Sequence, residues 1–236
     1  MSDPSRGELD RIRTLYAADF DMESRGPESP WHPLNPVSIY YRHAQERAIA
    51  SVFHECGLDP RGLRALDVGC GSGGFLRHLV SLGARPEDLC GVDLLEARVR
   101  IARRVCPQGM QLHEGSADSL PCSDASFDLV SQFTVFSSVL EDGLLGRIAA
   151  EALRVLKPGG HLLWYDLRRG NGTTTRGFET HHVAALFPGC EARALRALHS
   201  PGAMRLAPKV PLLLDLLDRV QALPKTHYLA MLQKPG

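Results

Sequence analysis

A glycine-rich stretch constrains this sequence more than any other feature: residues 66–75 read LDVGCGSGGF. An apolar run at 63–68 leads into it, and a segment with leucines at helical spacing, 75–82, follows it. This order predicts a strand, a tight glycine turn and a helix, so that backbone N–H groups at the helix N-terminus face a bound ligand. The glycines fit both GxGxG and GxGxxG, and the second spacing is a weak signal by itself.

Two carboxylates beside the loop strengthen the prediction of a ligand site. Asp67 directly precedes the glycines, and Asp93 ends the next apolar run, 89–93. Ligands of doubly wound sheets bind at the carboxyl ends of the strands. A carboxylate at such an end has two oxygens that accept hydrogen bonds from both hydroxyls of a ribose. The alternative role of Asp93 is a simple helix cap.

Three further segments follow in order, reading GVDLLEARV at 91–99, EGSADSLPCSDASFDLV at 114–130 and EALRVLKPGGHLLWYD at 151–166. Together with the glycine stretch they resemble the class I S-adenosylmethionine-dependent methyltransferases, and the resemblance covers about residues 63–166. It implies an enzyme that uses S-adenosyl-L-methionine as cofactor and releases S-adenosyl-L-homocysteine. The subfamily stays open.

The alternation of apolar runs and helical patterns predicts an α/β fold, a Rossmann-like doubly wound sheet with right-handed crossovers. The resemblance implies seven strands, the last one antiparallel. Strands are expected at 63–68, 89–93, 110–113, 127–133, 161–167, 190–199 and 226–233, and helices at 8–20, 37–56, 75–82, 95–105, 145–155 and 180–187. We expect a helical N-terminal lid over 1–60 and a cofactor-binding domain over 61–236, with a helical insertion near 200–223.

The composition of the chain limits the classes of partner that we expect. The chain has 236 residues and a formal net charge of zero, so no broad attraction to nucleic acid is expected. The six cysteines are scattered without metal-ligand spacing, which indicates reduced thiols and no metal site. The N-terminus lacks a signal-peptide pattern, and no apolar run has membrane-spanning length. We expect a cytoplasmic protein, a monomer or homodimer, with a small-molecule acceptor and no nucleic acid or membrane partner.

The resemblance assigns cofactor contacts residue by residue. Asp67 would meet the ammonium of the cofactor, Asp93 its ribose, and Arg42 its carboxylate. The third segment departs from the usual Gly-Asp-Ala, because it reads Gly-Ser-Ala-Asp; either Ser116 or Asp118 would accept from the adenine amine. The full expected set is Asp67, Gly69, Gly71, Gly73, Asp93, Leu94, Ser116, Ala117, Gln132, Phe133 and Arg42.

The acceptor side gives weaker signals. A hydroxyl acceptor gains from a base with a pKa near the working pH, and histidine has such a pKa. His182 follows the fifth predicted strand, Asp166 ends that strand, and Tyr41 lies in an aromatic-basic cluster of the second helix. These three are the catalytic candidates, and an amine acceptor would need no base. His181 and His182 are expected on different sides of a helix, which makes them a poor metal pair.

The sequence therefore predicts a methyltransferase that acts on an oxygen or nitrogen of a small molecule, possibly derived from a natural product, glycan or peptide. One alternative is a methyltransferase of macromolecules, although 131–136 (SQFTVF) lacks the Asn/Asp-Pro-Pro-aromatic box of base-amino enzymes. Another is a cofactor-binding protein without turnover. A nicotinamide-dependent oxidoreductase is a third, because Gly69, Gly71, Gly74 and Asp93 also fit that fingerprint.

Overall fold

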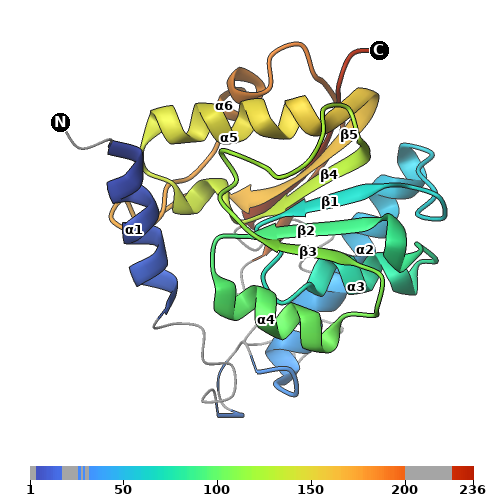
Figure 1. The fold of residues 1–236 in the computed structure, drawn as a ribbon, viewed down its shortest axis with the longest axis horizontal. Helices are drawn as coiled ribbons and strands as arrows, with labels where there is room; N and C mark the ends of the chain where they lie inside the picture. The colour runs from blue at the N-terminus through green and yellow to red at the C-terminus, as the bar shows by residue number, and fades with distance from the viewer. Residues whose placement is uncertain (1–3, 18–25, 28, 30–31, 200–224) are drawn as a thin grey trace.

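A seven-stranded sheet forms the centre of the computed structural model, which describes residues 4–17, 26–27, 29, 32–199 and 225–236 (Figure 1). The strand order is β3-β2-β1-β4-β5-β7-β6. The strands are β1 (Ala65–Val68), β2 (Leu89–Asp93), β3 (Gln111–Glu114), β4 (Phe127–Phe133), β5 (Leu156–Leu167), β6 (Glu191–His199) and β7 (Lys225–Gln233). The strands β1 to β5 pair in parallel, and β7 runs antiparallel to β5 and β6. The predicted doubly wound fold is confirmed.

Helices cover both faces of the sheet (Figure 1). They are α1 (Pro4–Ala17), α2 (Pro36–Glu55), α3 (Gly74–Ser81), α4 (Glu96–Val105), α5 (Asp142–Val155) and α6 (Thr180–Leu186), with short 3-10 turns η1 (Pro86–Asp88) and η2 (Phe136–Ser138). Because successive strand residues face opposite sides, Trp164 packs in the core with α5 and α6, and Tyr165 packs in the core with α2, α3 and α4. The inner parallel strands β1 and β2 are buried on both faces, whereas the edge strand β3 exposes Gln111 and Glu114.

The sequence located the elements of the domain well but missed one irregularity. Residues 157–160 separate the helix expected at 145–155 from the strand expected at 161–167, yet they lie inside β5, at an irregularity of its pairing. Phe127 pairs with Leu156 and Leu129 pairs with His161, so the register shifts between them. Gly159 has a φ of +72°, a value that L side chains rarely adopt, which explains the glycine at this bend. The helix expected at 8–20 begins earlier, at Pro4, and its positions 18–20 lie outside the described residues, as does the insertion expected near 200–223.

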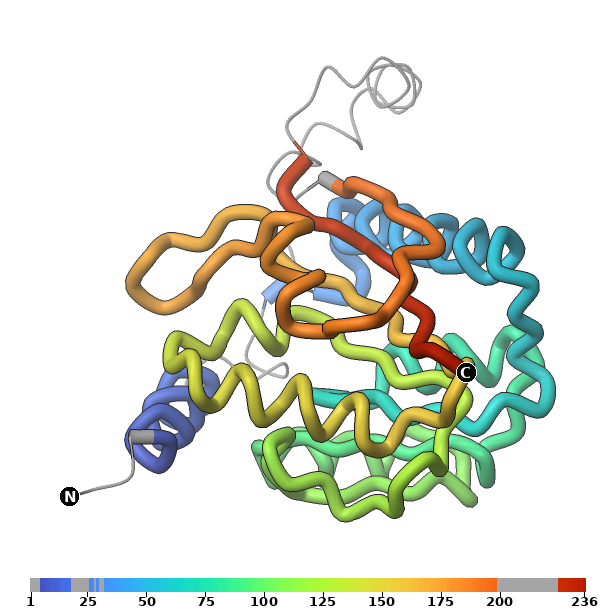
Figure 2. The backbone as a smooth tube through the Cα atoms, turned by 90° about the horizontal axis from the view of Figure 1, so that it is seen from above, coloured from blue at the N-terminus to red at the C-terminus, as the bar shows by residue number. Residues whose placement is uncertain are grey.

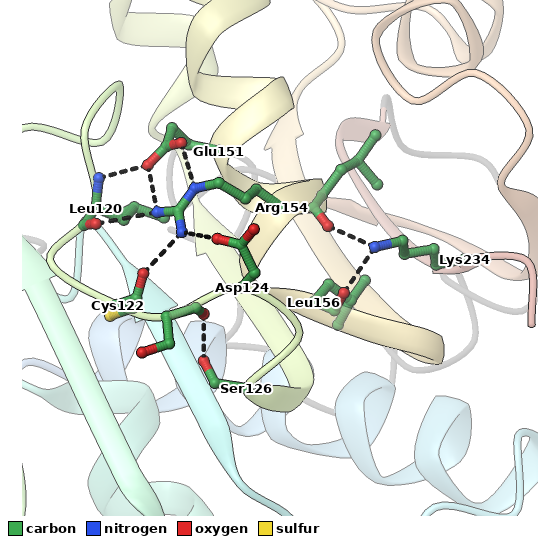
Figure 3. A network of polar contacts seen from close by, with 10 residues as sticks. Leu120, Cys122, Asp124, Ser126, Glu151, Arg154, Leu156 and Lys234 are labelled. Atoms are coloured by element: carbon green, nitrogen blue, oxygen red, sulfur yellow. Dashed lines mark hydrogen bonds and ion pairs between the residues drawn. The ribbon is translucent and has the colours of Figure 1, made fainter.

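The C-terminal end of α5 fixes the loop that follows β3 (Figure 3). Arg154 donates to Glu151 and Asp124 at 2.6 Å each and to the carbonyl oxygens of Leu120 and Cys122. Glu151 in turn accepts from the Leu120 N–H at 2.7 Å. Charged groups therefore hold the loop that carries residues 115–126 against the helix.

The two N-terminal helices lie apart in both views (Figures 1 and 2). The apolar residues Ala48, Ile49, Val52 and Phe53 of α2 pack in the core with strands β5 to β7. Ile12 of α1 instead joins the core on the α5 side. None of the described helices combines the length and apolar character that crossing a bilayer requires.

Candidate functional site

A pocket opens at the carboxyl ends of β1 to β4, between these strand ends and α1. Its floor comes from the loops after the strands, and its outer wall comes from Leu9, Ile12 and Tyr16 of α1. Of the residues predicted from sequence, it brings together Gly69, Asp93, Leu94, Ser116, Ala117 and Phe133. The position agrees with the rule that ligands of doubly wound sheets bind at carboxyl strand ends.

The glycine loop needs its glycines for two reasons. Gly69, Gly71 and Gly73 have φ values of +69°, +54° and +79°, in the left-handed region that favours glycine. At Gly69 a Cβ atom would also overlap the side chain of Val135, which lines the pocket. The backbone can therefore approach a ligand closely at this turn.

Asp93 connects the glycine loop to the pocket. It is 4% exposed, and its Oδ2 accepts from the Gly71 N–H at 2.8 Å while Oδ1 accepts from the Leu95 N–H at 2.9 Å. A carboxylate has about four lone-pair sites, so each oxygen keeps one for a further donor. The arrangement suits the two hydroxyls of a ribose. The capping role that the sequence left as an alternative is wrong, because Leu95 is the N-cap residue of α4 and no side chain makes a cap hydrogen bond there.

Asp67 is buried on β1 next to β4. It accepts from the Ser131 hydroxyl at 2.7 Å, and burial raises its pKa to about 7, with the nearby Asp93 adding to the effect. The carboxylate does not line the pocket as Asp93 does. A positive charge placed beside it would favour its ionised form.

Gln132 carries an unpaired donor close to the pocket. Its Oε1 accepts from the Val135 N–H at 3.1 Å, which fixes the orientation of the amide, and its buried Nε2 has no partner among the described residues. An unsatisfied buried donor costs about 1–3 kcal/mol. The orphaned donor, the glycine cradle and the free lone pairs of Asp93 fit a polar nucleoside cofactor with acceptor and hydroxyl groups.

The remaining predicted residues lie elsewhere. Arg42 is exposed on α2 and donates to the carbonyl of Pro33 at 3.1 Å, outside the pocket. His182 is exposed on α6, where its Nδ1 accepts from the Glu179 N–H at 3.1 Å as part of a capping box. Its ring lies 3.9 Å from that of His181, so the expected divergence of the two side chains is wrong.

The other two catalytic candidates also do not line the pocket. Asp166 is buried, with its carboxylate accepting from the N–H groups of Ser137 at 3.1 Å and Leu167 at 2.8 Å; burial raises its pKa to about 6. The Tyr41 hydroxyl lies 2.6 Å from that of Tyr165 beneath α2, and burial raises the pKa of Tyr41 to about 12. Their catalytic roles stay predictions.

The sequence analysis expected a helical N-terminal lid over 1–60 but named none of the α1 residues that line the pocket. Leu9, Ile12 and Tyr16 share one helical face, at spacings of three and four residues, and this pattern is the signal that could have found them. In the described part of the chain no group of three or more His, Cys, Asp or Glu side chains is arranged to hold a metal ion.

Comparisons with known proteins find similarity to methyltransferases. Residues 66–164 match the family model described as "Methyltransferase domain". A ubiquinone biosynthesis O-methyltransferase of Xanthomonas axonopodis pv. citri is 32% identical over 168 residues, covering 70% of this chain and 62% of that protein. A phthiotriol/phenolphthiotriol dimycocerosates methyltransferase of Mycobacterium ulcerans is 37% identical over 111 residues, covering 47% of this chain and 40% of its own.

The match therefore spans less than two thirds of the length of either relative. Among solved structures, an S-adenosylmethionine-dependent methyltransferase from Mesorhizobium loti has the same fold, with a TM-score of 0.60 and 20% identity. That comparison covers 89% of this chain and all of the other. The matched domain, the curated relatives and the fold together make this chain similar to S-adenosylmethionine-dependent methyltransferases.

Proposed function

We propose that the protein transfers a methyl group from S-adenosylmethionine to an oxygen or nitrogen of a small-molecule acceptor. The observation that carries the proposal is the pocket in which Asp93, the glycine loop and the loop of Ser116 converge. The name of the Xanthomonas relative, an O-methyltransferase, supports oxygen as the first choice.

The residues of this chain bind and align rather than react. Asp93 holds the ribose and the glycine loop with the same carboxylate, and Gly69 lets the backbone approach the ligand. Asp67 supplies negative charge for the ammonium of the amino-acid part. When bound, S-adenosylmethionine supplies both the methyl group and its own leaving group, so alignment and exclusion of water are the main tasks of the protein.

The wall made by α1 serves the second task. Its apolar side chains Leu9 and Ile12 face the pocket, and three hydrogen bonds join α1 to Ser138 of η2 and to Leu140, two residues beyond η2. The acceptor hydroxyl forms its new bond to the methyl carbon and gives its proton to a base or to water. We place this activity in the cytoplasm. All six cysteines are free thiols, which supports this location.

Transfer of labelled methyl groups tests the proposal. The full chain is incubated with trideuteromethyl S-adenosylmethionine and a panel of phenols, alcohols and amines, and products are detected by mass spectrometry. We expect a labelled product from at least one acceptor, and less of it with the Asp93→Ala variant at the same limiting cofactor concentration. Binding of the cofactor without any labelled product would instead support the alternative of a cofactor-binding protein without turnover.

A further inference from the structure

The residue directly after β4 has a rare backbone conformation. Thr134 has a φ of +58°, in the left-handed region that L side chains rarely adopt and that β-branched side chains disfavour most. In the described part of the chain, ten glycines and two other residues have positive φ, and the second exception is Ala125 at +46°. Where only a bend is needed, this chain thus mostly uses glycine. A threonine in this conformation indicates that its side chain has a use.

Hydrogen bonds from two neighbouring elements hold Thr134 in this conformation. Its N–H donates to the carbonyl of Tyr165 on β5 at 2.7 Å, and its carbonyl accepts from the hydroxyl of Ser138 in η2 at 3.1 Å. The Ser138 Oγ also lies 2.6 Å from the hydroxyl of Tyr16 on α1. Both backbone groups of Thr134 are therefore satisfied, and the surrounding structure imposes a φ that the residue alone would avoid.

The Thr134 hydroxyl is a hydrogen-bond acceptor at the wall of the pocket. Thr134 is exposed and lines the pocket, whereas Ala125 is exposed outside it. The Thr134 Oγ1 donates to the carbonyl of Phe133 at 2.7 Å, and a carbonyl can only accept. This contact engages the hydroxyl proton and leaves the lone pairs of the oxygen for a donor. The side chain therefore offers a ligand an acceptor oxygen and not a proton.

The strand order places Thr134 on the far side of the glycine loop from Asp93. Because β1 lies between β2 and β4, the strand ends present Asp93, Gly69 and Thr134 to the pocket in that order. Val135 occupies the space that a Cβ of Gly69 would need, so the segment of Thr134 packs directly against the loop. With the ribose at Asp93 and the ammonium at Asp67 on β1, the sulfonium that joins them lies toward the β4 side of the pocket.

We infer that Thr134 contacts the methyl acceptor, and that its Oγ1 accepts a hydrogen bond from the O–H or N–H group that takes the methyl. The inference rests on the proposed function, because it assumes methyl transfer in this pocket. The acceptor atom bonds to the methyl carbon as the carbon–sulfur bond breaks and leaves its electron pair on sulfur, and the acceptor proton passes to a base or to water. Thr134 orients the lone pair of the acceptor and keeps its own proton on the Phe133 carbonyl.

Thr134→Val tests the contact, because valine keeps the branched shape of threonine and lacks its oxygen. The probe is the phenol, alcohol or amine that wild type labels fastest in the trideuteromethyl assay. We expect kcat/KM for this acceptor to fall about 10- to 100-fold, while the dissociation constant of S-adenosylhomocysteine changes by less than about twofold. Thr134→Ser, which keeps the hydroxyl, should retain most of the activity. Unchanged kcat/KM in Thr134→Val would overturn the inference.

Thr134→Gly separates the side chain from the bend. Relief of the strained φ should raise the midpoint of thermal unfolding by roughly 2 °C, after the greater freedom of glycine in the unfolded chain offsets part of the gain. The value of kcat/KM should nevertheless fall as in Thr134→Val. Ala125→Gly is the matched control, because Ala125 shares the positive φ outside the pocket, and it should raise the midpoint without changing methyl transfer. A fully active Thr134→Gly variant would contradict the acceptor contact.

Binding of the acceptor without turnover gives an independent measurement. When the same acceptor is titrated into the full chain saturated with S-adenosylhomocysteine, wild type should bind it about tenfold more tightly than Thr134→Val does. Equal binding, together with equal kcat/KM, would overturn this inference and leave the proposed function intact. A folded wild type that labels no compound of the panel would overturn the proposed function, and this inference with it.

Discussion

At the scale of single residues, the two carboxylates beside the glycine loop differ in their hydrogen-bond partners. Asp93 accepts two backbone N–H bonds, which hold it in place at the pocket. Asp67 accepts from the Ser131 hydroxyl, and burial raises its pKa to about 7. The ordinary aspartate pKa is 3.8, so Asp67 takes up a proton on folding at mildly acidic pH. The free energy of unfolding should therefore fall as the pH rises from about 4 to about 7.

The same pKa predicts how cofactor binding depends on pH. If the Asp67 carboxylate faces the ammonium of the ligand, the ligand binds the ionised form, and its dissociation constant should fall as the pH rises through about 7 and then level off. Calorimetric titration with S-adenosylhomocysteine between pH 6 and 8.5 measures this dependence. On the order of one proton should be released for each ligand that binds the protonated form. Asp67→Asn should flatten the profile. A flat wild-type profile would contradict the contact.

Gly69 and Gly71 offer a matched pair of substitutions. Both have positive φ, which costs an L residue about 1–2 kcal/mol, but only at Gly69 would the new Cβ overlap Val135. Overpacking adds about 1–3 kcal/mol, so Gly69→Ala should lower the free energy of unfolding by more than Gly71→Ala. Urea denaturation at equal m-values measures the difference. Equal losses would show that the Val135 side chain can move away from the new Cβ without lowering the free energy of unfolding.

At the scale of elements, α1 is fastened to the segment after β4. The Glu8 carboxylate accepts from the Leu140 N–H and from Arg11, which in turn donates to the carbonyl of Ser138. The Arg11 guanidinium lowers the pKa of Glu8, so the contact should persist until the pH falls below the ordinary glutamate range. The Tyr16 hydroxyl, 2.6 Å from the Ser138 Oγ, adds a further contact.

Substitutions of two acidic residues of α1 distinguish the contacts that attach α1 to the segment after β4 from the stability of the helix itself. Glu8→Gln should reduce the free energy of unfolding by about 1–2 kcal/mol and weaken S-adenosylhomocysteine binding, because α1 supplies a wall of the pocket. Asp10→Asn removes a pair of the same spacing, Asp10 with Arg13, on the exposed face of the helix, and should leave binding unchanged. Equal effects of the two substitutions on binding would argue against a role of α1 in the pocket.

Local patterns explain which elements could be predicted. The strands around the glycine loop are short apolar runs bounded by Gly, Pro and Asp, and such signals survive in any tertiary context. The attachment of α1, by contrast, joins Glu8 to Leu140, and Arg147 of α5 pairs with Asp118. These contacts join residues far apart in sequence, so a single sequence carries no local signal for them. The partners of His182 and Arg42 are nearer, because the Glu179 N–H is three residues from His182 and the Pro33 carbonyl nine residues from Arg42.

At the scale of the whole molecule, the pocket lies on one side of the sheet edge and α2 covers the other. Phe133 lines the pocket and packs against Tyr165 at 5.5 Å between ring centroids, and Tyr165 stacks on His227 at 5.0 Å. One ring layer thus separates the cofactor pocket from the Tyr41–Tyr165 pair. A ligand that fills the pocket should stabilise the folded chain by about 2.7 kcal/mol at 100 times its dissociation constant, which thermal unfolding with S-adenosylhomocysteine measures.

The central claim is that the glycine loop and Asp93 bind a sulfonium nucleoside, and direct calorimetric titration of the full chain tests it. We predict one S-adenosylhomocysteine bound per chain, no binding of NADH, and affinity weakened by about 1–3 kcal/mol in Asp93→Ala. A correctly folded chain that binds NADH, or that shows no affinity for S-adenosylhomocysteine, would contradict the account.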